Sequence, residues 1–411
     1  MTMPSTTAAT QALMRASRRK GLLLLELALL AVVAVSSILS GEAAGRPSQA
    51  AKASLVWQLD LQQFGFVRPK DDWYATNARI SFTSAETVVP AWFSPSSPAA
   101  AVPSAGTRFQ APPQRLEALF LDAAAGKVRN KKEWPTGSRR GEIIPAGAGR
   151  FMVTTADDGS TLYSPTFDQL VRFEAGSTLS VSPDGKTILV KEKSGPPPYT
   201  FRWIDLGSLR VLRSWESKGP EDTDLPGGKI GPICDDVMML PFPREGFLIR
   251  NLNGPWQLVR IWRWRGLPEF QFVSRELLAV WFRGREYNGE SYFSLIRTDG
   301  TVLLDREFSS QFLRRPAISA DGRRIALPIL KAHGGSAFFD IAEEYSLSRI
   351  QVYDVPSRKW ICTLSAKDAA TKRLGGLGIS PDGSLLALLS QDGILRMFKI
   401  PGPSSKNEGR N

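Results

Sequence analysis

The stretch Val181-Ser182-Pro183-Asp184-Gly185, followed by Lys186-Thr187-Ile188-Leu189-Val190, decides the fold because copies of it recur along the chain. Proline fixes φ at the first turn position, the aspartate side chain closes the turn, and glycine adopts a positive φ. The hydrophobic residues after the turn predict a buried strand. Each copy therefore predicts a hairpin made of a strand, a tight turn and a second strand.

The copies are distributed over most of the chain. Residues 379–388 repeat the whole pattern, residues 318–327 repeat it with Ala320 in place of the proline, and residues 272–280 and 82–89 are shortened copies. A second hairpin with an aspartate-containing turn follows, as in residues 121–128, 204–212, 297–304 and 352–360. Two hairpins in succession predict one four-stranded antiparallel blade, which needs a neighbour on each face to bury its hydrophobic side chains.

The spacing of the first turns predicts the number of blades. These turns fall near residues 84, 147, 183, 235, 275, 320 and 381, which indicates seven blades, with insertions that lengthen some of the intervals. The usual period of a propeller is about 40–45 residues per blade. The last blade lacks a fourth strand after residues 394–400, whereas residues 53–61 form a spare strand near the start. Pairing the two would close the ring and remove both open edges. We expect an all-β, seven-bladed β-propeller of four-stranded antiparallel blades over residues 53–400, closed by an N-terminal strand.

The repeats resemble the WD-repeat-like propellers of bacterial extracytoplasmic proteins. The resemblance covers about residues 53–400 and rests on the Ser-Pro-Asp-Gly turns and on second turns such as Asp205-Leu206-Gly207-Ser208-Leu209-Arg210. The Trp-Asp and Gly-His pairs of the eukaryotic repeats are missing. Because this repeat class hosts many unrelated functions, the resemblance implies the fold and no activity.

The first 44 residues predict a signal peptide or a membrane anchor. A polar start ends in Arg18-Arg19-Lys20, an apolar run interrupted by Glu26 covers residues 21–39, and small residues follow at 41–44. This is the order of a secretory signal. The run is also close to the roughly 17–25 residues of an uncleaved transmembrane helix. Either interpretation places an N-terminal hydrophobic helix before the propeller and the rest of the chain outside the cytoplasm. We expect residues 401–411 to be a disordered tail.

Composition limits the chemistry. The net charge of +12 permits anionic partners, but the basic residues are scattered, and we expect no binding of nucleic acid. Cys234 and Cys362 fall two blades apart, so we expect both to be unpaired. His333 is the only histidine of the sequence, and one histidine cannot form a multi-histidine metal site. We therefore expect no metal and no cofactor.

Two further motifs favour structural roles. Residues 155–162 resemble the Asp-box of sialidase-like propellers, in which the box is a hairpin turn, and Asp157 and Asp158 are too few carboxylates for a complete calcium site. Residues 260–265 alternate arginine with apolar side chains, including Trp262 and Trp264. On a strand the tryptophans share one side. An aromatic binding platform and packing between blades both fit this pattern, and we favour packing.

The long insertions predict where a partner binds. They lie at about residues 93–113, 193–199, 282–291 and 331–347, each between the second and third strands of a blade and therefore on one face of the ring. Long loops on a rigid scaffold often carry binding function. Surface insertions without function would look the same. The partner-binding candidates on these loops are Tyr199, Arg283, Arg285, Tyr287, Lys331, His333, Phe338 and Phe339.

These observations favour a monomeric, non-catalytic extracytoplasmic propeller that acts as a scaffold for an unidentified protein or cell-envelope component. The alternative is a propeller enzyme, such as a lactonase-like hydrolase or a quinoprotein-like oxidoreductase, with a metal ion or cofactor bound in the central channel. The scarcity of histidine disfavours this alternative, while carboxylate-based calcium sites stay open.

Overall fold

The computed structural model describes most of the chain after the N-terminal segment. The described residues are 52–67, 78–95, 114–136, 141–155, 159–175, 177–192, 198–217, 231–242, 246–252, 254–261, 268–282, 291–309, 311–332 and 345–402. They belong to one compact unit, Ala51–Asn411. The predicted N-terminal helix and most of the predicted C-terminal tail lie outside the described residues.

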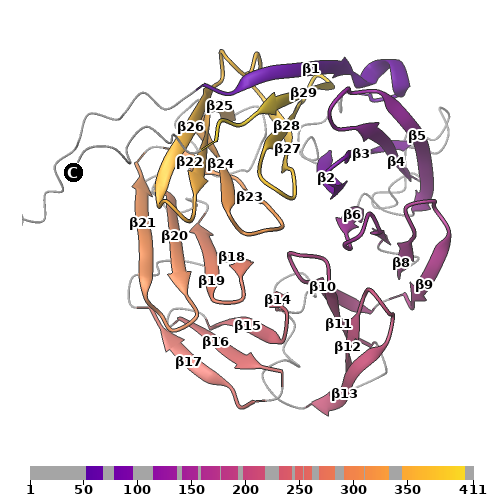
Figure 1. Ribbon diagram of the computed structural model, residues 1–411, viewed down its shortest axis with the longest axis vertical. Helices are drawn as coiled ribbons and strands as arrows, with labels where there is room; N and C mark the ends of the chain where they lie inside the picture. The colour runs from indigo at the N-terminus through magenta and orange to yellow at the C-terminus, as the bar shows by residue number, and fades with distance from the viewer. Residues whose placement is uncertain are drawn as a thin grey trace, which may run out of the picture. The chain divides into compact units, whose positions relative to one another are not determined.

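The described strands form seven antiparallel sheets arranged in a ring (Figure 1). Each sheet is one blade, and the blades are numbered in chain order. Within a blade, the strands are given from the innermost strand to the outermost. Blade 1 contains β2 (Arg79–Ser84), β3 (Thr87–Pro95), β4 (Gln114–Asp122) and β5 (Val128–Thr136). Blade 2 contains β6 (Gly141–Pro145), β7 (Phe151–Thr155), β8 (Gly159–Tyr163) and β9 (Gln169–Phe173). Blade 3 contains β10 (Thr178–Val181), β11 (Thr187–Lys191), β12 (Tyr199–Asp205) and β13 (Val211–Ser217).

The remaining blades follow the same order. Blade 4 contains β14 (Ile233–Cys234), β15 (Val237–Phe242), β16 (Gly246–Asn251) and β17 (Gln257–Arg260). Blade 5 contains β18 (Glu269–Ser274), β19 (Leu277–Phe282), β20 (Ser291–Arg297) and β21 (Val302–Phe308). Blade 6 contains β22 (Gln311–Leu313), β23 (Ala317–Ile318), β24 (Arg324–Ala332), β25 (Tyr345–Asp354) and β26 (Lys359–Ser365). Blade 7 contains β27 (Leu374–Ile379), β28 (Leu385–Ser390), β29 (Ile394–Lys399) and β1 (Ser54–Asp60).

Blade 6 departs from the four-strand pattern because its innermost strand is divided. β22 and β23 both pair with β24, and the gap between them contains Pro316. Proline has no N–H to donate to the ladder, which explains the break at this point. The other described sheets have the four strands that the sequence predicts, and all seven predicted first turns lie between the first two strands of a blade.

The N-terminal strand closes the ring as the sequence predicts. β1 pairs antiparallel with β29, from Ser54 opposite Lys399 to Asp60 opposite Ile394. The indole nitrogen of Trp57 donates to the carbonyl of Ala123 in blade 1 at 2.9 Å, so β1 also contacts the next blade. A short 3-10 helix, η1 (Leu61–Phe64), follows β1. Closure thus joins the two ends of the described chain and leaves blade 7 without an open outer edge on β29.

The Ser-Pro-Asp-Gly turns are closed by two side chains and one backbone conformation. In blade 3 the Ser182 hydroxyl donates to Asp184 at 2.7 Å and accepts the amide of Thr187 at 3.0 Å. Gly185 has a φ of 69°. The equivalent serine–aspartate bonds measure 2.6 Å in blades 6 and 7. The predicted roles of aspartate and glycine are confirmed, and the serine adds a bond that the sequence argument did not include.

The hydrophobic core is divided among the interfaces between neighbouring blades. One cluster combines Trp281 and Phe293 of blade 5 with Ile325 and Leu327 of blade 6. Every residue of β19 is buried, because a second strand is covered by neighbouring blades on both faces. Cys234 and Cys362 are buried and free in blades 4 and 6, which confirms that they do not pair.

Candidate functional site

The two faces of the ring differ in their connections. The turn face carries the hairpin turns between first and second strands and between third and fourth strands. The loop face carries the connections between second and third strands and from one blade to the next, because antiparallel strands end alternately on opposite faces. All four predicted insertions join a second strand to a third strand, at β3–β4, β11–β12, β19–β20 and β24–β25. The strand ends that flank them therefore share the loop face.

Two of the eight predicted partner-binding residues lie in the described part of the chain. Tyr199 begins β12 in blade 3 and is half-buried, with the ammonium of Lys191 3.9 Å from its ring centroid. Lys331 lies near the end of β24 in blade 6 and is exposed. Both are at the loop face, but they stand in different blades that are not neighbours. Arg283, Arg285, Tyr287, His333, Phe338 and Phe339 lie outside the described residues, so their placement stays a prediction.

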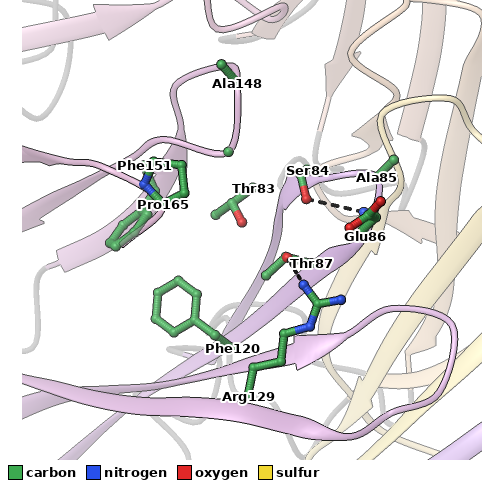
Figure 2. A pocket seen from close by; sticks show the side chains of 11 residues that line it. Thr83, Ser84, Ala85, Glu86, Thr87, Phe120, Arg129, Ala148, Phe151 and Pro165 are labelled. Atoms are coloured by element: carbon green, nitrogen blue, oxygen red, sulfur yellow. Dashed lines mark hydrogen bonds between the residues drawn. The ribbon is translucent and has the colours of Figure 1, made fainter. Parts of the chain in front are cut away.

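A groove on the turn face was not predicted from the sequence. It has a volume of about 400 Å³ and lies between blades 1 and 2. Figure 2 shows Phe120, Phe151 and Pro165 on one side, with Arg129 reaching toward Thr87 on the other. The β2–β3 turn adds Ser84 and Glu86 to the lining. The sequence reveals both turns, but it does not show that the turns of neighbouring blades lie side by side.

The charges of this groove are already paired in part. The Arg129 guanidinium donates to Asp122 at 2.6 Å and to the hydroxyl of Thr87 at 3.3 Å. Hydrogen bonds from Arg129 and from the backbone amide of Ala125 lower the pKa of Asp122. The aspartate also holds the β4–β5 turn, since it accepts the amides of Ala124 and Ala125. Arg129 and Asp122 therefore stabilise the β4–β5 turn.

The buried thiols are kept in their protonated form. Burial raises the pKa of Cys234 to about 12, and it also raises the pKa of Cys362. A thiol becomes a nucleophile or a metal ligand only as the thiolate. Both cysteines therefore serve as packing residues in the folded protein.

The remaining predictions from the sequence can be compared with the structure only where they fall on described residues. Within the described ranges, no group of three or more His, Cys, Asp or Glu side chains could hold a metal ion. Residues 155–162 connect β7 to β8, as expected of a hairpin, but Asp157 and Asp158 lie outside the described residues. Arg260 ends β17, and Trp262 and Trp264 also lie outside them. In the part of the chain that the structure covers, no helix is both long and apolar enough to span a membrane.

The fold was compared with known proteins. No family model matches the sequence, and no curated protein matches it. Among solved structures, the chain is similar to the crystal structure of the C-terminal WD40 domain of Sif2, with a TM-score of 0.42 and 12% identity over 86% of this chain and 99% of that chain. The assignment of the fold rests on the strand pairing itself. By its four-stranded blades, Ser-Pro-Asp-Gly turns and closing strand, the described chain is a WD-repeat-like, seven-bladed β-propeller.

Proposed function

We propose that this protein is a non-catalytic, extracytoplasmic scaffold that binds another protein or a cell-envelope component through its loop face. The observation that carries the proposal is the asymmetry of the ring. Tight turns closed by hydrogen bonds cover the turn face, and the four longest connections within blades start and end on the loop face. A rigid ring that presents its longest connections on one side is a common arrangement for recognition.

The proposed location rests on the N-terminal sequence. A basic segment, an apolar run and small residues in this order support export or anchoring by residues 1–44. A reporter enzyme that is active only outside the cytoplasm, fused after residue 402, tests this location in the host. We expect activity from the full-length fusion and none from a fusion that lacks residues 1–44. Equal activity of the two fusions would contradict the proposed export.

The proposed binding face is tested with a matched pair of positions in blade 6. Lys331 is exposed near the loop-face end of β24, and Arg323 is exposed in the turn just before β24 begins on the turn face. A photoreactive phenylalanine analogue at each position reports which end of the same strand meets a partner in the host. We expect a specific cross-linked product from position 331 and none from position 323. Cross-linking only at position 323, or equally at both, would contradict a loop-face partner.

A further inference from the structure

Two arginines lie in the interface between blades 5 and 6, which are neighbours in the ring (Figure 1). Arg306 lies on β21, and the strand register places it in one row with Phe293 and Trp281 of the same blade. Arg349 lies on β25 opposite Ile329, whose side chain belongs to the same inter-blade cluster as Phe293 and Trp281. The register therefore brings a guanidinium group from each blade to one interface.

Neither guanidinium group has a countercharge among the described residues. The guanidinium of Arg306 lies 5.1 Å from the ring centroids of Phe308 and Trp360, so its only described contacts are aromatic. Arg349 donates one hydrogen bond of 3.3 Å, to the neutral side chain of Gln311. Both arginines are half-buried. Two cations held together in this way repel each other and lose part of their hydration.

The pKa values agree with this geometry. Burial lowers the pKa of Arg306, and the charge of Arg349 lowers it further. Burial also lowers the pKa of Arg349. Arginine stays protonated in proteins, so the repulsion persists at every pH at which the fold is stable.

Buried polar atoms without partners lie in the same interface. Trp281 is only 2% exposed, and its indole nitrogen has no hydrogen-bond acceptor among the described residues. Gln351 pairs in the strand register with Leu327 of the same cluster, and within the described part of the chain its side-chain oxygen accepts no hydrogen bond. An unpaired buried polar group costs free energy, and such a group calls for a specific explanation. The interface therefore offers an indole N–H and two guanidinium groups as donors, together with a side-chain amide that can also donate.

We propose that the interface between blades 5 and 6 binds an oxyanion, a phosphoryl or carboxylate group, between the guanidinium groups of Arg306 and Arg349. Each guanidinium can donate two parallel hydrogen bonds to such a group. Phe308 and Trp360 lie beside the Arg306 guanidinium, which favours one orientation of its donors. An oxyanion would neutralise the repulsion that the described residues leave uncompensated. This site stands apart from the loop-face proposal, since it can be occupied whether or not a partner binds there.

The test is a calorimetric titration of the full-length protein in chloride buffer at low ionic strength, with inorganic phosphate and, separately, acetate as probes. We expect saturable binding of one anion per chain. Binding of phosphate alone indicates a phosphoryl ligand, and binding of acetate alone indicates a carboxylate ligand. R306Q and R349Q should each weaken binding about 10- to 100-fold, the range expected for the loss of a charge-assisted hydrogen bond.

The matched control is R115Q, because Arg115 is another partly exposed arginine of a blade, paired with Glu133 at 3.0 Å. Its substitution should leave anion binding unchanged. Arg349→Lys keeps the charge without the planar fork and should recover part of the affinity lost in R349Q. A purely structural role for Arg349 would not give this order of affinities.

Thermal unfolding gives a second readout that does not depend on heat of binding. Phosphate or acetate should raise the Tm of the wild type and leave the R306Q/R349Q double variant unchanged. Without the anion, R349Q should keep or raise the Tm, because it removes a repulsion. Asp340, Glu343 and Glu344 are the acidic residues of the predicted insertion at about residues 331–347. Three results would overturn the proposal: no saturable binding and no Tm shift with either ion, equal binding by the double variant, or binding that appears only in D340N/E343Q/E344Q. The last result would show that carboxylates of the chain itself occupy the site.

Discussion

The interface between blades 6 and 7 and the interface between blades 5 and 6 use arginine in opposite ways. Between blades 6 and 7, Arg324 donates to the carbonyl of Gly383 at 2.9 Å, and its Nε lies 3.8 Å from Asp354. The side chains of this pair are only 12% and 8% exposed. Between blades 5 and 6, Arg306 and Arg349 have no carboxylate partner among the described residues. Similar blade packing thus accommodates both an arginine with a carboxylate partner that links two blades and a pair of arginines without one among the described residues.

The glycine turns differ between the same two interfaces. Gly322 has a φ of 67° and Gly383 a φ of 71°, so the backbone cost of a side chain is nearly equal at both. A methyl group on Gly322 would lie 2.3 Å from the backbone oxygen of Val273 in blade 5. A methyl group on Gly383 would lie 2.7 Å from a side-chain carbon of Arg324. The backbone of Val273 can move away from a new methyl group only if its strand is displaced, whereas the Arg324 side chain can change its conformation.

The largest expected effect is therefore the loss of stability in G322A. We expect G322A to lower the free energy of unfolding by about 3 kcal/mol, the sum of strain at positive φ and displacement of a neighbouring strand. G383A should cost about 1–2 kcal/mol, because Arg324 can move aside at the expense of its hydrogen bond. Urea unfolding of the two variants measures the difference.

Gly65 is the matched control for the glycine pair. It has a φ of 96°, but a methyl group there would meet nothing closer than 3.6 Å, at the ammonium of Lys131. G65A should therefore show the backbone cost alone, about 1 kcal/mol. Equal losses in G322A, G383A and G65A would show that close approach between blades contributes nothing.

The second expected effect is the opening of one interface by R324Q. Removal of Arg324 leaves Asp354 buried with a weaker set of partners and should cost about 2–3 kcal/mol. R306Q should cost almost nothing by comparison. Cys362 packs between blades 6 and 7, and Cys234 packs between blades 4 and 5, so their reaction with a thiol reagent reports the two regions separately. R324Q should accelerate labelling of Cys362 and leave the rate at Cys234 unchanged.

The pKa of the Cys362 thiol determines how the labelling rate of R324Q is interpreted. Burial raises the pKa of Cys362, and the charge of Arg324 lowers it by a smaller amount. Removal of Arg324 therefore makes the thiol intrinsically less reactive. Faster labelling can then come only from opening of the interface, and slower labelling at Cys362 would contradict its proposed role.

The fold was predictable because local chemistry specifies it. Pro183, Asp184 and Gly185 indicate a turn without knowledge of any distant residue, and seven first turns, some of them separated by insertions, indicate the ring. The spare strand at residues 53–61 was predictable for the same reason, since a blade without its fourth strand is visible in the sequence. Fold information is thus carried by residues close together in the chain.

The candidate sites were harder to predict because they depend on register between distant strands. The row of Trp281, Phe293 and Arg306 exists only through two strand pairings, and its position opposite Arg349 depends on how blades 5 and 6 pack. From strand order, the sequence correctly predicted that the four insertions share one face of the ring, and partner binding at that face stays a prediction. Of its eight residues there, only Tyr199 and Lys331 lie in the described structure, and these two stand in different blades.

The smallest expected effect is a change in how stability depends on acid pH, which should differ between a turn aspartate and the arginine pair. Hydrogen bonds from the hydroxyl and then the amide of Ser208 lower the pKa of Asp205 in the β12–β13 turn. A carboxyl whose folded pKa lies below its unfolded value, about 3.9 for aspartate, stabilises the fold fully above that value. The contribution is lost as the pH falls through the folded pKa. The urea midpoint should therefore decrease below about pH 4, and D205N should show a smaller decrease because it has one fewer group to protonate.

The arginine pair should not share this acid dependence, because arginine does not titrate in the acid range. R306Q should therefore keep the wild-type decrease of the urea midpoint between pH 5 and pH 3, while D205N reduces it. If R306Q reduced the acid dependence as much as D205N, a carboxylate would have to lie within reach of Arg306. That carboxylate would supply the missing countercharge, and the two interfaces would no longer differ in kind. Acid titration of the wild type, R306Q and D205N thus tests, without any ligand, whether Arg306 lacks a carboxylate partner.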